Sequence, residues 1–162
     1  MLQLSGRELA WIVVIAAVGI VFLTLRTRDR SAAITTPFTA NPALTPGALN
    51  EDVTQATIER TICVRGWTRT IRPPSSYTSQ LKLRQMGDYG ASGSPSDYQE
   101  DHLISLELGG HPTDPRNLWP EPQPRAEQVD GIENDLNDRI CSGSISLAEA
   151  QERIRKEKYS KG

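Results

Sequence analysis

The only two histidines of the chain lie in one short stretch, EDHLISLELGGHPTDPRNLWP, at residues 100–120. His102 directly follows Glu100 and Asp101. Histidine titrates near neutral pH and can activate water as a general base, and a neighbouring carboxylate can bind a hard divalent cation. A base beside a cation is what the hydrolysis of a phosphodiester requires, so this stretch is the candidate reactive centre.

The elements around this stretch must bring Asp101 and His102 to one site. Neighbouring residues on a regular strand point to opposite faces, so both side chains can serve one site only if a strand starts or bulges there. Apolar and polar residues alternate over 103–108, which predicts a half-buried strand. The glycine pair at 109–110 predicts a turn, and a short return strand is expected to begin at Asn117, after a loop.

The C-terminal third of the chain has the spacing of two helices. From near Glu127 to Cys141, apolar residues recur at three- and four-residue intervals and predict a helix with one buried stripe. Ser146 and Glu149 form a capping-box pattern that opens a second helix. The buried side of that helix is marked by Leu147, Ala150 and Ile154. Its basic tail, RIRKEKYSKG, is expected to fray.

The charge of the chain is nearly balanced. Its 162 residues include 18 basic and 20 acidic side chains, which fits one modest domain with accessory sequence and excludes a globally basic nucleic-acid binder. Positive charge is local instead, because segment 61–86 has no acidic residue and carries Arg65, Arg69, Arg72, Lys82 and Arg84. This segment is either a surface that contacts phosphates or a solvated face whose counter-charges lie elsewhere in the fold.

The two cysteines, Cys63 and Cys141, form either a disulfide or two buried thiols. Metal binding is not expected without a second pair. In an exported domain, a disulfide that closes a loop of nearly eighty residues would contribute about 4 kcal/mol of stability in the chain-entropy model.

Residues 9–25, LAWIVVIAAVGIVFLTL, form an uncharged apolar run. Its length is at the short end of the roughly 17 to 25 residues that cross a bilayer as a helix. An uncleaved anchor is favoured over a cleaved signal peptide, because the run is longer than the usual h-region. The sequence thus predicts a membrane anchor with a basic flank over 1–30, a flexible linker over 31–56 and a folded domain over 57–162.

Two signals for the side of the membrane disagree. More arginines follow the apolar run than precede it, which would leave the domain in the cytoplasm. The cysteine pair instead favours an oxidising compartment. We expect the domain on the periplasmic or extracellular side, with the cytoplasmic side as the alternative.

The Asp-His pair, the glycine turn and the Asn-Leu dipeptide of EDHLISLELGGHPTDPRNLWPEP resemble the first two elements of the HNH endonuclease motif. This motif belongs to the ββα-metal nuclease fold. The resemblance extends to a bacterial and phage HNH-like subgroup through CVRGWTRTIRPPSSYT upstream and IENDLNDRIC and SISLAEAQ downstream, and it covers roughly residues 60–155. It implies an α+β domain with an HNH-like ββα core and flanking helices, which the transmembrane helix predicted from the apolar run at 9–25 would precede.

The resemblance also implies roles for individual residues. His102 would be the general base, and Asp101 would be a ligand of a single catalytic divalent cation. Asn117 would tie the loop together and help to fix the base. As our extension of the family pattern, we expect phosphate contacts from Arg116 and from the basic segment, at Arg65, Arg69 and Arg72.

The chain departs from the family pattern at the end of the motif. The motif ends with a metal-binding histidine on the helix, and no histidine follows His111 here. Glu127 or Asp130, near the expected helix start, would supply an oxygen ligand instead. An all-oxygen site favours Mg²⁺ or Mn²⁺ over Zn²⁺. The alternative is that metal binding and cleavage have been lost with the missing histidine.

Three functions follow as alternatives. The first is a membrane-tethered, metal-dependent endonuclease that cleaves nucleic acid, expected to be DNA, with little sequence preference. The second is a noncatalytic module that binds nucleic acid or a partner, and the third is a structural envelope domain. In the plainest interpretation His102 only hydrogen-bonds across a loop and Asn117 caps a turn. Trp67 and Trp119 are expected in the core.

Overall fold

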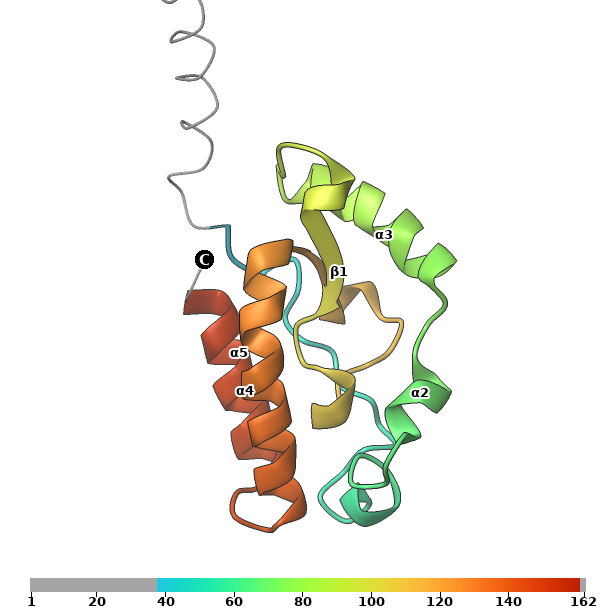
Figure 1. The fold of residues 1–162 in the computed structure, drawn as a ribbon, viewed down its shortest axis with the longest axis vertical. Coiled ribbons are helices and arrows are strands. Elements are labelled where there is room, and N and C mark those ends of the chain that lie inside the picture. The colour runs from blue at the N-terminus through green and yellow to red at the C-terminus, as the bar shows by residue number, and fades with distance from the viewer. Residues whose placement is uncertain (1–37, 161–162) are drawn as a thin grey trace, which may run out of the picture. The chain divides into compact units, whose positions relative to one another are not determined.

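This computed structural model describes residues 38–160 (Figure 1). The apolar run at 9–25 lies outside these residues, so the membrane anchor stays a prediction. Within 38–160, none of the helices combines the length and the hydropathy that a bilayer crossing requires.

The centre of the fold is an antiparallel pair of strands, β1 (Tyr98–His102) and β2 (Leu118–Pro122), and helix α4 (Gln123–Cys141) follows β2 directly. At one end of the pair His102 lies opposite Leu118. Figure 1 shows β1 between α3 (Ser75–Asp88) on one side and the pair of α4 and α5 (Leu147–Ser160) on the other. The predicted α+β class is confirmed.

The prediction of a strand over 103–108 is wrong. Strand β1 ends at His102, and the chain then forms a loop with a 3-10 turn at Leu106–Leu108. The apolar residues of this stretch are all buried, at most 3% exposed, so their alternation does not mark a one-sided strand. Asn117 takes the place of a partner strand. Its side chain accepts a hydrogen bond from the Ile104 N–H and donates one to the Ile104 carbonyl, both at 3.0 Å.

Helix α4 begins at Gln123, earlier than the position near Glu127 that the apolar spacing predicts. The reason is local: Pro124 lies in the first turn, where its missing N–H would have no helical partner. The helix ends at Cys141, as predicted.

Helix α5 opens with the predicted cap. The Ser146 hydroxyl accepts a hydrogen bond from the Glu149 N–H at 3.2 Å. The helix then continues to Ser160, so most of the basic tail is helical and the prediction that it frays is wrong over the part of the chain that the structure describes.

Two apolar clusters form the core. The larger one joins α4 and α5 to the loop after β1 and to the N-terminal part of the domain; its best-buried members are Ile104, Leu108, Ile140, Ala150 and Ile154. The smaller one surrounds Trp119, which is fully buried and stacks on Phe38 with ring centroids 6.2 Å apart. Trp119 is therefore a core residue, as predicted, and Trp67 packs partly buried against the larger cluster.

The segment 38–56 packs into the domain rather than forming the expected free linker. Ala40, Thr45 and Val53 are buried, and the segment bonds to the loop between the strands through the backbone of Gly47 and of Asn50. The sequence showed no periodicity here because these contacts are made between irregular loops. The described part of the domain therefore begins at residue 38, not at 57.

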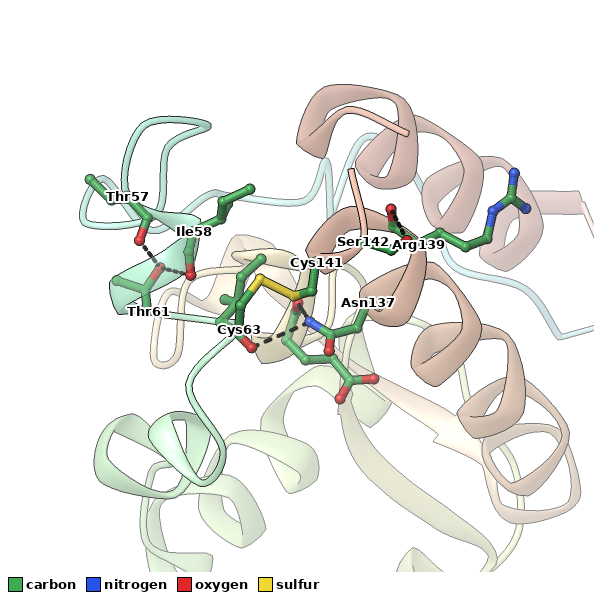
Figure 2. Close-up of a disulfide and its surroundings, with 10 residues drawn as sticks. Thr57, Ile58, Thr61, Cys63, Asn137, Arg139, Cys141 and Ser142 are labelled. Carbon is green, nitrogen blue, oxygen red and sulfur yellow. Dashed lines mark hydrogen bonds between the residues drawn. A yellow bond between two sulfur atoms is a disulfide. The ribbon is translucent and has the colours of Figure 1, made fainter. Parts of the chain in front are cut away.

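The predicted disulfide between Cys63 and Cys141 is confirmed (Figure 2). It joins the chain just before the short helix α2 (Trp67–Ile71) to the end of α4. Asn137, one turn earlier in α4, donates hydrogen bonds to the Ile62 carbonyl at 3.4 Å and to the Glu107 carbonyl at 2.7 Å. These contacts fix the start of the basic segment against α4.

Replacing both cysteines, Cys63→Ser with Cys141→Ser, should lower the free energy of unfolding by about 4 kcal/mol, because the unfolded chain loses the cross-link over 78 residues. Urea unfolding followed by tryptophan fluorescence measures this change. A reducing agent should destabilise the wild type to a similar extent and leave the double variant unaffected. Equal stability of the variant and the oxidised wild type would contradict the expectation.

Candidate active site

His102 lies at the end of β1 and is 7% exposed. Its Nε2 is 3.0 Å from the carbonyl oxygen of Pro112, on the loop between the strands. A carbonyl oxygen only accepts, so Nε2 carries the proton and donates it. The other ring nitrogen, Nδ1, therefore holds the lone pair, which is the arrangement that a general base needs.

The surroundings of His102 favour its neutral form. Burial lowers the pKa of His102, while the Pro112 carbonyl and the Asp101 charge act in the opposite direction. The positive charges of Arg72 and Lys158 lower this pKa further. The imidazole is thus a neutral base at pH 7, and Arg72 of the basic segment lies close enough to influence it.

Asn117 holds the loop that carries the Pro112 carbonyl. The side chain of Asn117 is fully buried. Besides its two bonds to Ile104, it donates a hydrogen bond to the His111 carbonyl at 3.0 Å. Gly110 permits this close packing, because a Cβ at that position would lie 1.8 Å from the Ile104 carbonyl oxygen. Asn117 thus fixes the backbone of Ile104 and of His111, which precedes the Pro112 carbonyl that binds His102.

Asp101 points to a different partner. Its Oδ2 lies 2.5 Å from the ammonium nitrogen of Lys158, a fully buried side chain on α5. The same nitrogen lies 2.7 Å from Glu133 Oε1 and 3.5 Å from Glu121 Oε2, and it donates to the His102 carbonyl at 2.7 Å. One ammonium therefore contacts β1, β2 and α4.

A second cation completes this group. Arg125 Nε lies 3.0 Å from Glu121 Oε1, and the Arg125 guanidinium also donates to the Glu157 carbonyl at 2.9 Å. We call the five interacting side chains the Lys158 cluster; they are Asp101, Glu121, Arg125, Glu133 and Lys158.

The charges within the Lys158 cluster are unequal. Burial alone would raise the pKa of Asp101, but the Lys158 ammonium holds it well below its usual range. Burial raises the pKa of Glu121 to about 8 and that of Glu133 to about 7, and the Asp101 charge adds to both increases against the effect of Lys158. The three carboxylates raise the pKa of Lys158 despite its burial. The ion pair of Asp101 and Lys158 is thus the fixed pair, and the glutamates titrate near neutral pH.

The residues around Asp101 do not fit the divalent ion that the family resemblance implies. The ammonium of Lys158 already lies among the three carboxylates, so an ion could enter only by displacing it. Over residues 38–160 no group of three or more His, Cys, Asp or Glu side chains has a geometry for a metal ion. Glu127 and Asp130 are exposed on α4, and Asp130 acts on the pKa of Glu107 instead.

The basic residues differ in their availability. Arg65, Arg69 and Arg72 are exposed and have no ion-pair partner within the described part of the chain. Lys82 instead donates to the carbonyls of Pro95 and Tyr98 at 2.7 and 2.8 Å. Of the three exposed arginines, Arg72 is the one whose charge reaches His102.

Arg116 is held by its neighbour. Its guanidinium binds the Asp114 carboxylate in a fork, with the shortest contact at 2.6 Å. The carboxylate offsets much of the positive charge that Arg116 would offer to a phosphate. Arg72 is therefore the better candidate for a phosphate contact beside His102.

Sequence reasoning missed Lys158 and its two glutamate partners. A signal was present, because Lys158 continues the spacing of the buried side of α5 from Leu147 through Ala150 and Ile154. The partners of Lys158 carried no such signal, since they come from separate elements that only the tertiary fold brings together.

Glu100, next to Asp101, is a buried acid of another kind. Both of its carboxylate oxygens are buried without a hydrogen-bond partner among the described residues. Burial raises the pKa of Glu100 to about 8, in spite of the nearby Lys82 and Arg84. Its side chain is therefore mostly protonated at neutral pH.

Comparisons with known protein families, with curated proteins and with solved structures found no match to this chain.

Asn117→Asp should lower the free energy of unfolding by about 3 kcal/mol, because a carboxylate cannot donate to the carbonyls of Ile104 and His111 and both would be left without this partner. Chemical denaturation measures the change. Asn134→Asp is the matched control, because Asn134 is exposed and bonds only within α4, to the Asp130 carbonyl. Equal effects of the two substitutions would argue against the role of Asn117.

Glu100→Gln should change the pH dependence of stability. The folded-state pKa of about 8 lies above the unfolded value of 4.5, so the stability tied to the protonated side chain is complete below pH 4.5 and is lost as the pH rises towards 8. The variant should match the wild type near pH 4 and exceed its stability by about 4 kcal/mol near pH 8, because one pKa unit corresponds to about 1.4 kcal/mol. Thermal unfolding across this pH range tests it, with the exposed Glu127→Gln as control. A parallel pH profile for wild type and Glu100→Gln would refute the assignment.

Proposed function

We propose that the domain hydrolyses phosphodiester bonds of nucleic acid as an HNH-like endonuclease, with His102 as its general base. The observation that carries this proposal is the hydrogen bond from His102 Nε2 to the Pro112 carbonyl, which leaves Nδ1 as an acceptor in a neutral imidazole. The order of β1, loop, β2 and α4, with Asn117 binding across the loop, supports the ββα assignment that the sequence resemblance suggested.

The proposed chemistry uses the residues at hand. His102 Nδ1 takes a proton from water, and the resulting hydroxide attacks phosphorus. The bond from phosphorus to the leaving sugar oxygen then breaks, and that oxygen is protonated from solvent. Arg72 would hold the nonbridging phosphate oxygens, where a guanidinium offers paired donors. The resemblance implies a divalent ion for the leaving oxygen, but the residues at Asp101 do not fit one, so no step is assigned to it.

The proposed substrate is DNA with little sequence preference. The exposed arginines of the basic segment are suited to phosphate contacts, which position a nucleic acid without reading its bases. The disulfide supports an oxidising compartment for the domain, on the periplasmic or extracellular side of the membrane that the 9–25 segment would anchor it to.

A second candidate is a module that binds nucleic acid without cleaving it. The pairing of Asp101 with Lys158 favours this candidate, because it engages the carboxylate that the family would use as a metal ligand. The basic segment would serve both candidates equally, so only a measurement of cleavage separates them.

Incubating the purified full chain with supercoiled plasmid, in Mg²⁺, in Mn²⁺ and in EDTA, should give nicked DNA in at least one of these conditions. His102→Ala should slow nicking by about 100-fold or more through the loss of the base. His111→Ala is the matched control. The Nδ1 atom of His111 accepts hydrogen bonds from the Thr113 and Asp114 N–H groups, and the His111 side chain forms no hydrogen bond with His102 in the described part of the chain. A His102→Ala variant that nicks as fast as the wild type would refute the proposal.

Plasmid binding by the same proteins tests the second candidate. Binding should persist in His102→Ala and weaken in Arg72→Ala, with a smaller dependence on salt for the arginine variant. Binding by the wild type without nicking would favour the noncatalytic module. The absence of both would leave a structural domain.

A further inference from the structure

The Lys158 cluster lies where the sequence resemblance leads one to expect a metal ion, next to Asp101 and beside α4. Lys158 is fully buried, and its partners Glu121 and Glu133 are 0% and 12% exposed at their side chains. A buried lysine is rare unless its charge is matched. Lys158 takes no part in the proposed chemistry, which depends on His102 and Arg72.

We propose that the ammonium of Lys158 is the built-in cation of this domain: it takes the place of a divalent metal ion at Asp101 and holds β1, β2 and α4 together through α5. The inference concerns metal binding and folding, and it stands independently of whether the domain cleaves nucleic acid.

The nitrogen donates two hydrogen bonds, to Asp101 Oδ2 and to the His102 carbonyl, and forms an ion pair with Glu133. An ammonium has three N–H donors. Three oxygens lie within hydrogen-bond distance: Asp101 Oδ2 at 2.5 Å, the His102 carbonyl at 2.7 Å and Glu133 Oε1 at 2.7 Å. Glu121 Oε2, at 3.5 Å, adds a fourth electrostatic partner. Oxygen atoms therefore surround the ammonium, as they would surround a divalent metal ion, but at distances typical of hydrogen bonds.

The ammonium is also held in place by the packing of α5. Lys158 lies on the same side of the helix as Ala150 and Ile154, which are fully buried in the core. The end of the helix is fixed by the Tyr159 hydroxyl, which donates to the Thr45 carbonyl at 2.9 Å. A metal ion could therefore replace the ammonium only if the Lys158 side chain left this buried position.

The charge of the cluster suits a single ammonium. Arg125 supplies a second positive charge to Glu121, so the two cations face at most three negative charges, and fewer near neutral pH, where Glu121 and Glu133 are partly protonated. A divalent ion in addition to both cations would give an excess of positive charge in a buried site, and such a charge is costly without matching partners.

The first test uses the wild-type full chain and Mn²⁺ as the probe. The EPR signal of free Mn²⁺ should be the same with and without the protein, and the melting temperature should be equal in Mn²⁺ and in EDTA. One Mn²⁺ bound per chain, with binding abolished by Asp101→Asn, would overturn the proposal. So would a melting temperature several degrees higher in Mn²⁺ than in EDTA.

The second test compares Lys158→Met with Lys156→Met, the same change at an exposed position of α5. Lys158→Met leaves the buried Asp101 carboxylate without its ammonium and should lower the melting temperature by more than about 10 °C, or prevent folding. Lys156→Met should change it by about 1 °C. Equal melting temperatures for the two variants would overturn the proposal, and the Mn²⁺ measurement on the wild type decides it if Lys158→Met does not fold.

Discussion

The buried ammonium of Lys158 joins four elements of this domain, because it comes from α5 and contacts β1, β2 and α4. It binds the Asp101 carboxylate and the His102 carbonyl of β1, and it lies beside glutamates of β2 and α4. Assembling such charges away from water is costly, and removing one partner is costlier still, because an unpaired buried charge remains. The loss of Lys158 would therefore cost more stability than the intact ion cluster contributes.

The position of His102 follows from the same arrangement. Its carbonyl is bound by Lys158 on one side, while its ring is bound by the Pro112 carbonyl. Asp101 and His102 are adjacent in sequence but have separate partners, as neighbouring residues of a strand do. The His102 imidazole is held in its neutral form, while the Asp101 carboxylate forms an ion pair with the buried Lys158. This division is the main difference from what the family resemblance led us to expect.

The loop between β1 and β2 is held in place by the side chain of Asn117 and not by pairing with a further strand. Asn117 binds backbone groups of Ile104 and His111, and Gly110 leaves the space for it. The disulfide between Cys63 and Cys141 fixes the start of the basic segment against α4. A small core with long irregular connections thus has three kinds of support besides burial: an ion cluster, an amide and a disulfide.

The sequence by itself determined the features that depend on short-range patterns. These are the end of α4 and the cap of α5 at Ser146. The α+β class was implied by the family resemblance and not by a short-range pattern. Only the tertiary structure decided the partner of Asp101, which is 57 residues away at Lys158, and the packing of 38–56. It also decided that 103–108 forms a loop, because the bonding partner of Ile104 is a distant side chain and not a neighbouring strand. Local periodicity reports which face of an element is buried, but it carries no information on which distant group will satisfy a buried charge or amide.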